Sequence, residues 1–262
     1  LVADDQTQPF PATKPSNQHV QVHLEDNDVE LVLGERVVGL EGDEAGRVKA
    51  VRTDRRAIPA DCVVVAVGTR PNDELAKGAG LLCNRGILVN ENCQTSDPDI
   101  YAGGDCVVNH AVDPSARGPL FVPLGSTSNK HGRTIADDIA GRPHPFAGIT
   151  STGVCQAFDY TLGRTGLTER QAREVEQEVE SMIWAGPDSP HYMPRSKPLV
   201  IKMVASKRTR KLLGVQVVGP GDGSKRLDVG ASTLYYGGTV DDVAQIDLGY
   251  APPYGPPIDP IA

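Results

Sequence analysis

The run Cys62-Val-Val-Val-Ala-Val-Gly68 is the feature that most restricts the fold of this chain. Its apolar residues are continuous and mostly β-branched, and a glycine closes the run. A half-buried strand would instead alternate apolar with polar positions. A continuous run is typical of a strand that is buried on both faces inside a parallel sheet. We therefore expect the first part of the chain to form an α/β domain with a parallel central sheet.

The composition indicates a folded, acidic protein. The 262 residues are 39% apolar and 23% charged, which provides material for one large domain or two ordinary ones. A formal net charge of -8 argues against binding to nucleic acid. The apolar stretch Cys62–Thr69 is too short to cross a bilayer, which takes about 20 residues. The first residues show no basic region followed by an apolar core. We expect a cytoplasmic protein without a membrane anchor.

The cysteines and histidines predict neither a disulfide framework nor a metal site. The cysteines are Cys62, Cys83, Cys93, Cys106 and Cys155. Because their number is odd and no Cys-x-x-Cys pair occurs, reduced thiols are the simpler interpretation. His19 and His23 have the spacing of metal ligands on a helix, but no third ligand is indicated. We therefore predict a solvated helix face at the two histidines.

After Pro145 the pattern changes to short strands separated by turns. Strands are predicted at Val154–Tyr160, Met182–Ala185, Leu199–Ala205 and Leu212–Val218. The segment Thr168-Glu-Arg-Gln171 fits a capping box that opens a short helix, and a further helix is expected over about Lys225–Tyr236. These elements predict an α+β module after the α/β part.

The strongest local signal for a binding site is Thr95-Ser-Asp-Pro-Asp-Ile-Tyr-Ala-Gly-Gly-Asp105. A short apolar strand ends there in two glycines and a carboxylate, and ligands of open α/β sheets lie beyond the carboxyl ends of strands. Glycines let the backbone approach a ligand, and a carboxylate can accept hydrogen bonds from two hydroxyl groups of a polyol. The alternative is a Gly-Gly turn with a capping aspartate, and the pattern alone favours neither.

A predicted helix from about Ser126 to Ile139 follows this motif. Ser126 or Ser128 is expected to cap its start, and Gly141 to end it. The first amide groups and the helix dipole suit a group that becomes negative on reduction. Taken alone, an ordinary surface helix is the simpler interpretation. The order of the two features is what suggests a functional site.

Four segments resemble motifs of the pyridine nucleotide-disulfide oxidoreductases. They are Ala66-Val-Gly-Thr-Arg-Pro-Asn72, Thr95 to Cys106, Pro123-Leu-Gly-Ser-Thr-Ser-Asn-Lys-His-Gly-Arg133 and Asp247-Leu-Gly-Tyr-Ala-Pro-Pro-Tyr-Gly-Pro-Pro-Ile-Asp-Pro260. The last one resembles the C-terminal motif of coenzyme A-disulfide reductases and the related NADH oxidases and persulfide reductases. The resemblance implies the C-terminal part of an NAD(P)H-binding domain at 1–71, the C-terminal part of an FAD-binding domain at 72–147, and a dimerisation domain at 148–262.

The resemblance also implies roles for residues on the flavin side. Asp105 would bind the ribityl chain of FAD, and Gly104 would allow its close approach. The helix start near Ser128 and Asn129 would face the pyrimidine edge of the flavin.

Two tyrosines would serve the substrate side. In the coenzyme A-disulfide reductases two tyrosines reach into the partner subunit's active site, and Tyr192 and Tyr250 match them. A phenol at that place can donate a hydrogen bond or a proton to a departing coenzyme A thiolate. Without the family, each would be interpreted as a half-buried structural tyrosine.

The sequence departs from the family at three features that the reaction needs. It contains neither the proximal Gly-x-Gly-x-x-Gly for FAD, nor a second one for NAD(P)H, nor the redox cysteine of the N-terminal half. Gly219-Pro-Gly-Asp-Gly-Ser224 has serine where a third glycine would stand, and we interpret it as a turn. We therefore expect the C-terminal portion of a longer protein, inactive alone, with FAD and NAD(P)H bound only by the full-length protein.

The function implied is that of an FAD-dependent NAD(P)H oxidoreductase that acts on coenzyme A disulfide, persulfide or a related disulfide. The expected partners are a second copy in a homodimer and a coenzyme A-type thiol or disulfide, with no nucleic acid and no membrane. Two alternatives stay open. One is a non-catalytic dimerisation and scaffold module, and the other is an NADH oxidase or peroxidase of the same family.

Overall fold

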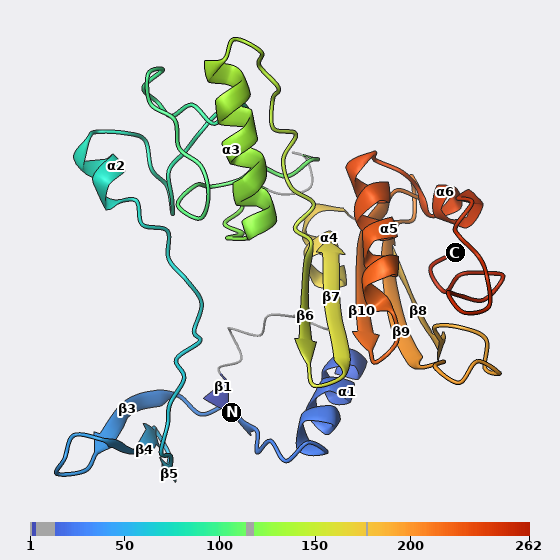
Figure 1. Cartoon of the computed structure of the whole chain (residues 1–262), viewed down its shortest axis with the longest axis horizontal. Coiled ribbons are helices and arrows are strands. Elements are labelled where there is room, and N and C mark those ends of the chain that lie inside the picture. The colour runs from blue at the N-terminus through green and yellow to red at the C-terminus, as the bar shows by residue number, and fades with distance from the viewer. Residues whose placement is uncertain (1, 4–13, 114–117, 177) are drawn as a thin grey trace. The chain divides into compact units, whose positions relative to one another are not determined.

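The computed structural model of the chain describes residues 2–3, 14–113, 118–176 and 178–262. It divides into two compact units, Leu1–Gly68 and Thr69–Ala262 (Figure 1). Among the described residues, no helix is both long and apolar enough to cross a bilayer. The three domain boundaries expected from the sequence stay predictions.

The described residues of the first unit form one helix and two small sheets. Helix α1 covers Lys14–Glu25, and β1 (Val2–Ala3) pairs in parallel with β2 (Val32–Leu33). The antiparallel sheet β3-β4-β5 comprises Val37–Gly42, Val48–Thr53 and Ala57–Pro59. In the β3–β4 turn, Asp43 Oδ1 accepts hydrogen bonds from the Ala45 and Arg47 amides, both at 2.9 Å. Gly46 adopts a φ of 75°, which a glycine reaches without strain.

The buried parallel strand predicted at Cys62–Gly68 is not observed. The segment has no regular secondary structure, and Val64, Val65 and Val67 are 85%, 72% and 75% exposed. The reason is that a two-faced strand needs hydrogen-bonding neighbours and a covering layer on each side. The neighbouring sheet β3-β4-β5 is antiparallel and ends at Pro59. In the described ranges, parallel pairing is confined to β1–β2 and to isolated bridges.

The described residues of 69–113 and 118–147 form two helices, several isolated β-bridges and a series of turns. The helices are α2 (Glu74–Gly78) and α3 (Gly125–Ile139). The prediction of α3 is confirmed, but the expected cap at Ser126 or Ser128 is wrong. Leu124 is the N-cap residue, and no side chain caps the helix. Gly141 closes α3 as predicted, with a φ of 71°.

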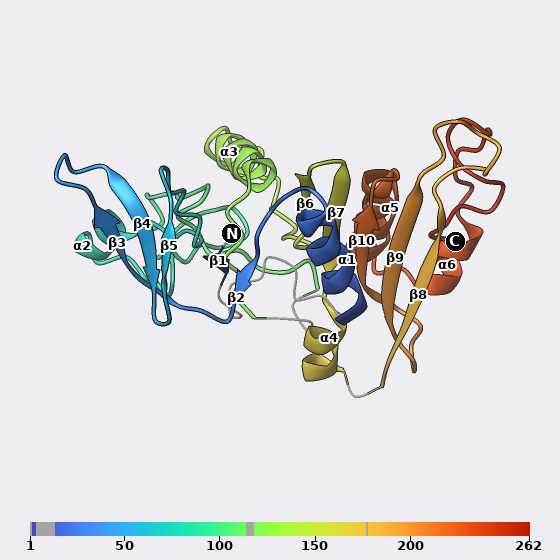
Figure 2. The same cartoon turned by 90° about the horizontal axis from the view of Figure 1, so that it is seen from below.

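A five-stranded antiparallel sheet in the order β6-β7-β10-β9-β8 forms the centre of the following part (Figure 2). Strands β6 to β10 cover Gly153–Ala157, Tyr160–Gly166, Val179–Pro187, Pro198–Ser206 and Leu212–Gly219. The three later strands confirm the predictions. The single strand predicted over Val154–Tyr160 is instead a hairpin that turns at Phe158, whose φ is 53°. The apolar pattern continues across this turn, so periodicity does not reveal the break.

Helices cover both faces of this sheet. Helix α5 (Gly223–Tyr235) packs against β10 and β7. Its close approach needs Gly230, where a Cβ atom would lie 2.7 Å from Val215 Cγ2. Helix α4 (Glu169–Val175) begins with the predicted capping box of Thr168 and Gln171. The main core consists of Leu199, Ile201, Met203, Leu212, Val215, Val217, Leu227, Val243 and Ile261.

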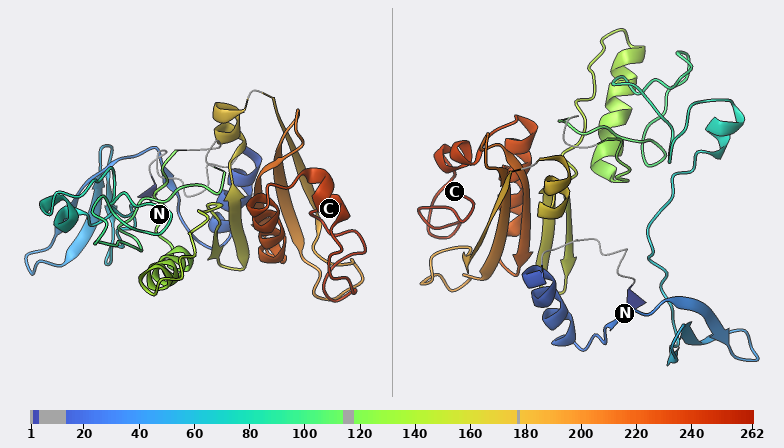
Figure 3. Two further views of the ribbon diagram at one scale, coloured as in Figure 1. Left: turned by 90° about the horizontal axis from the view of Figure 1, so that it is seen from above. Right: turned by 180° about the vertical axis from the view of Figure 1, so that it is seen from behind.

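Helix α6 (Val240–Gln245) was not predicted, although it also opens with a capping box. The box pairs Thr239 with Asp242, and the aspartate takes the place of the usual Glu or Gln. The views in Figure 3 show α6 and the C-terminal segment beside the end of the sheet that carries β8. There Ile261 is buried and belongs to the main core.

Candidate functional site

The Gly103-Gly104-Asp105 turn packs directly against helix α3. A Cβ atom on Gly103 would lie 3.0 Å from His131 Cβ and 3.1 Å from Ile135 Cδ1, so a larger residue would push the turn away from the helix. Gly104 has a φ of 86°, a conformation that favours glycine. Both glycines of the motif therefore have a physical reason, and together they bring Asp105 to the start of α3.

Ser128 contacts the carboxylate from the first turn of the helix. Its Oγ lies 3.1 Å from Asp105 Oδ1 and 3.2 Å from the Leu124 carbonyl oxygen, so one hydroxyl proton serves two acceptors. Among the described residues, no partner is recorded for the second carboxylate oxygen of Asp105. That exposed oxygen is free to accept a hydrogen bond from a ligand hydroxyl.

His131 supports the turn through a hydrogen bond and was not predicted from the sequence. The Gly104 amide donates a hydrogen bond to His131 Nδ1 at 3.0 Å, and the ring is 1% exposed. Burial, and secondly the nearby His110, lower the pKa of His131 below its ordinary value, which keeps Nδ1 available as an acceptor. His131 follows Ser128 by three positions, so the two share one helix face. That spacing is the signal that could have revealed it.

Asn129 does not join this cluster. Its Oδ1 accepts hydrogen bonds from Arg133 Nε at 2.9 Å and Arg133 Nη2 at 2.5 Å, one turn further along α3. The structure thus brings Gly104, Asp105 and Ser128 together. Asn129 is near the helix start only through the position of its backbone. The role expected for Asn129 stays a prediction.

This cluster has the chemistry that a flavin ribityl chain requires. A carboxylate with one oxygen available matches a polyol, and the glycine turn keeps the backbone close to whatever binds there. Helix α3 begins without a side-chain cap. Its first amides and its dipole therefore favour negative charge near Ser128. The residues present fit FAD on both counts.

Tyr192 and Tyr250 lie on two irregular segments of the part that contains the five-stranded sheet. Tyr192 is in the connection between β8 and β9 and is 64% exposed, with its ring edge-on to His191 at 5.8 Å. Tyr250 follows α6 and is 54% exposed. It lines a pocket of about 820 Å³ together with Arg195 and Tyr254. No hydrogen bond or ring contact between the two tyrosines is recorded, and their substrate role stays a prediction.

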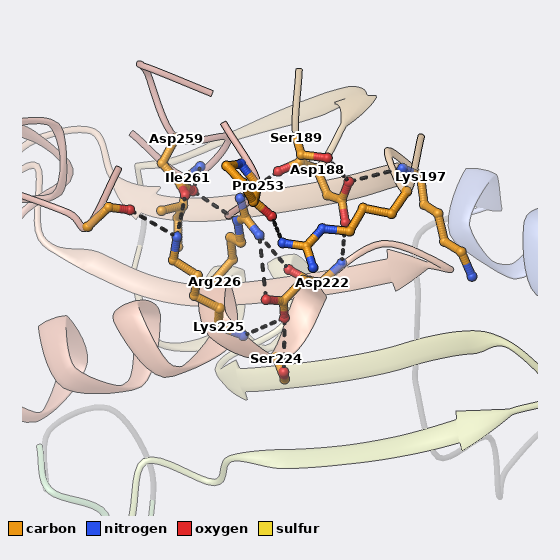
Figure 4. A network of polar contacts seen from close by, with 12 residues as sticks. Asp188, Ser189, Lys197, Asp222, Ser224, Lys225, Arg226, Pro253, Asp259 and Ile261 are labelled. Atoms are coloured by element: carbon orange, nitrogen blue, oxygen red, sulfur yellow. Dashed lines mark hydrogen bonds and ion pairs between the residues drawn. The ribbon is translucent and has the colours of Figure 1, made fainter. Parts of the chain in front are cut away.

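A buried polar network anchors both segments to α5 (Figure 4). Arg226 is fully buried and donates to Asp259 Oδ1 at 3.0 Å and to the Asp188 carbonyl oxygen at 2.9 Å. Lys225 Nζ lies 3.3 Å from Asp259 Oδ2. Hydrogen bonds from the Lys197 and Asp222 amides help to hold the pKa of Asp188 below its ordinary value against the opposing effect of burial. This network was not predicted from the sequence, because nothing local marks an arginine as buried.

The thiols differ strongly in exposure. Cys93 is 1% exposed, and burial raises the pKa of its thiol to about 11, which makes it a poor nucleophile. Cys62 and Cys155 are exposed, and Cys83 and Cys106 are intermediate. In the part of the chain that the structure describes, no group of three His, Cys, Asp or Glu side chains has the arrangement of a metal site.

The chain matches known proteins along most of its length. Residues 4–126 match the family model "Pyridine nucleotide-disulphide oxidoreductase", and residues 154–259 match the dimerisation domain of the same family. The NAD(P)H coenzyme A polysulfide/persulfide reductase of Pyrococcus horikoshii is 38% identical over 89% of this chain and 52% of that protein. The NADH oxidase of Enterococcus faecalis is 31% identical over 93% of this chain and 54% of that protein.

Solved structures give the same result. A NAD-dependent persulfide reductase from A. fulgidus has a TM-score of 0.92 at 34% identity, covering 99% of this chain and 48% of that one. The chain spans about half the length of the curated relatives it matches. These matches confirm the mixed α/β class, the dimerisation module and the resemblance drawn from the motifs. The chain therefore belongs to the pyridine nucleotide-disulphide oxidoreductases.

Proposed function

We propose that this chain provides the ribityl-binding turn and the dimerisation part of an FAD-dependent NAD(P)H oxidoreductase that reduces coenzyme A disulfide or persulfide. The observation that carries the proposal is the arrangement of Asp105, Ser128 and His131 around the Gly-Gly turn. The substrate class is supported by the names of relatives, which include a coenzyme A persulfide reductase and a coenzyme A disulfide reductase from Staphylococcus epidermidis.

In this proposal Asp105 accepts hydroxyl hydrogen bonds from the ribityl chain, and Ser128 holds the carboxylate in place. The start of α3 stabilises negative charge on the pyrimidine side. Bound FAD supplies the chemistry of accepting a hydride from NAD(P)H and passing two electrons to sulfur. The overall reaction consumes NAD(P)H, one proton and coenzyme A disulfide, and yields NAD(P)⁺ and two coenzyme A thiols.

Tyr192 and Tyr250 serve the substrate end of this reaction. Each phenol donates a hydrogen bond or proton to the coenzyme A thiolate as the disulfide bond breaks, which lowers the cost of the negative charge on sulfur. Both side chains are more than half exposed, as groups that meet a substrate or a second subunit must be. The match to a dimerisation domain supports a homodimer in which each chain offers its tyrosines to the other.

The test replaces both tyrosines with phenylalanine in the flavin-loaded dimer of the full-length protein. We expect turnover of coenzyme A disulfide to fall on the order of 10²-fold, with flavin content unchanged. Tyr236→Phe is the matched control, because Tyr236 is 84% exposed and is the C-cap residue of α5. Turnover that the double replacement leaves unaltered would remove both tyrosines from the reaction.

A second candidate is an NADH oxidase, which is favoured by relatives of that name in Enterococcus faecalis and Methanocaldococcus jannaschii. Oxygen consumption separates the two functions. A disulfide or persulfide reductase oxidises NAD(P)H faster when its sulfur substrate is added, whereas an oxidase consumes oxygen at the same rate with and without that substrate. Size-exclusion chromatography and a visible spectrum test the scaffold alternative, for which a colourless dimer is expected.

A further inference from the structure

The two tyrosine-bearing segments are anchored to the same buried side chain, Arg226. Arg226 on α5 donates to the Asp188 carbonyl oxygen, at the start of the Tyr192 segment, and to the Asp259 carboxylate, near the end of the tail that carries Tyr250. This arginine anchor lies in the core and fixes where each segment leaves the domain. It does not fix the two phenols, which are exposed and several residues further along the chain.

A second link joins the outer parts of the same two segments. Arg195 Nη2 donates a hydrogen bond to the Pro253 carbonyl oxygen. Its guanidinium also lies over the ring of Tyr254, 5.6 Å from the centroid, within the range of a cation–π contact. A guanidinium can form both contacts at once, because its planar fork donates in the plane and stacks through its face.

Local turns connect this link to the phenols. In the first segment, the Met193 amide donates to the Pro190 carbonyl at 2.9 Å and the Ser196 amide to the Met193 carbonyl at 3.0 Å. These turns join Tyr192 to Arg195 by a short, hydrogen-bonded path. In the tail, the Tyr254 and Gly255 amides donate to the Ala251 carbonyl, at 2.8 and 3.2 Å. Ala251 is the residue next to Tyr250, so the tail turn ties that tyrosine to Tyr254.

We propose that Arg195 is a positioning residue that couples the Tyr192 segment to the Tyr250 tail, so that the two phenols reach one departing thiolate together. The proposal rests on the proposed function for the identity of that thiolate. Arg195 itself touches no reacting atom. It acts through Pro253 and Tyr254. It connects the two segments at a place where the Arg226 anchor no longer constrains them.

The first test measures the coupling without reference to activity. Arg195→Ala is compared with Arg208→Ala, an exposed arginine in the β9–β10 turn, by amide hydrogen exchange in the dimer. We expect Arg195→Ala to speed exchange about tenfold at Ser196 and at Tyr254 and Gly255, and the control to change neither. Arg195 is exposed, so the replacement leaves the core and the thermal midpoint unchanged.

Replacing Tyr254 tests whether a change in the tail also speeds exchange in the Tyr192 segment. Tyr254→Leu removes the ring beneath the guanidinium and is expected to loosen the other segment at Ser196, whereas Tyr254→Phe keeps the ring and leaves exchange there unchanged. Combining Arg195→Ala with Tyr254→Leu should add little to either alone, because both break one link. Exchange that rises only in the replaced residue's own segment, or in neither, overturns the proposal.

The second test measures catalysis in the flavin-loaded dimer of the full-length protein. With coenzyme A disulfide as substrate, we expect Arg195→Ala to lower kcat about tenfold and change KM less than about threefold, with flavin content unchanged. Arg195→Lys keeps a donor for Pro253 but not the stacked plane, and it should restore part of kcat. If Tyr192→Phe with Tyr250→Phe is slow while Arg195→Ala is not, positioning by Arg195 is wrong. If the double replacement is not slow, the proposed role of the phenols is wrong, and hydrogen exchange alone decides the coupling.

Discussion

Ser128 Oγ lies 3.1 Å from Asp105 Oδ1, although 23 positions separate the two residues in the sequence. The contact joins the Gly-Gly-Asp turn to the first turn of α3. Because Ser128 is held by its helix and Gly104 by His131, the carboxylate is oriented before any ligand arrives. Preorganisation of this kind lowers the entropic cost of binding.

This orientation predicts that Asp105→Asn weakens flavin binding. The amide keeps the shape of the carboxylate but loses charge-assisted hydrogen bonds to hydroxyl groups, each worth about 1.5–3 kcal/mol. We expect the FAD affinity of the full-length protein to fall roughly 10- to 100-fold, as measured by titrating its apoprotein with FAD and following flavin fluorescence. Asp99→Asn, an exposed aspartate of the same segment, is the control and should bind FAD normally. Equal affinity of the two variants would exclude Asp105 from the site.

Glu169 predicts a specific loss of stability in acid. Hydrogen bonds from Lys202 in the first place, and then from Arg173, lower the pKa of this carboxyl from 4.5 to about 2. Because the folded pKa lies below the unfolded one, the stabilisation is fully present above pH 4.5 and is lost as the pH falls towards 2. Urea unfolding at several pH values should therefore show Glu169→Gln less stable than the parent at pH 7. The difference should shrink between pH 4.5 and 2.

The control for this pH effect is Glu174→Gln on the same helix. Glu174 is exposed and its replacement should change the free energy of unfolding by no more than about 0.5 kcal/mol. A difference between Glu169→Gln and the parent that stays constant from pH 7 to pH 2 would show that the ion pair with Lys202 is not its source.

The buried Arg226–Asp259 pair predicts a large effect on stability. Both side chains are almost inaccessible, so Asp259→Ala removes the buried carboxylate and leaves the guanidinium with only the half-exposed carboxylate of Asp222, 3.9 Å away. We expect a loss of about 3–5 kcal/mol in the free energy of unfolding, measured by denaturant titration. Asp228→Ala, at an exposed position of α5, should stay within about 0.5 kcal/mol of the parent. Similar values for the two variants would contradict the pairing.

The thiols predict an order of chemical labelling. Cys93 combines near-complete burial with a pKa of about 11, whereas Cys62 is exposed. Iodoacetamide at pH 8 should therefore modify Cys62 within minutes and Cys93 only after unfolding in urea, because the thiolate is the reacting species. Peptide mass spectrometry assigns each product. Early labelling of Cys93 in the folded protein would show that its surroundings open readily.

The sequence predicted elements whose determinants are local. Helix α3 ends where Gly141 takes a left-handed conformation, and α4 begins at the Thr168 capping box. Each depends on residues within one or two helical turns, so a short window contains the whole signal. The Gly-Gly-Asp motif was likewise visible as a pattern, and the reason for each of its glycines became visible only with α3 packed against it.

Cys62–Gly68 shows where local reasoning fails. Its composition is typical of a strand that is buried on both faces. Such a strand forms only where neighbouring strands supply hydrogen bonds and other elements cover both faces, and the described residues place no such elements around it. Val154–Tyr160 fails differently, because the apolar pattern runs through the turn at Phe158. Pairing with the next strand, which no window of sequence contains, decides where that hairpin folds back.

By itself, the sequence determined the family, the strands β8 to β10, the helices α4 and α5, and the residues of the Gly-Gly-Asp turn, since all of these reside in contiguous motifs. Only the tertiary structure decided that His131 supports the turn, that Arg226 is buried with Asp259, and that Arg195 reaches Pro253. The physical reason is the separation of the partners in the sequence. Which partner each side chain meets, and whether His131 and Arg226 are desolvated there, depends on elements that meet across 27 to 58 positions of the chain.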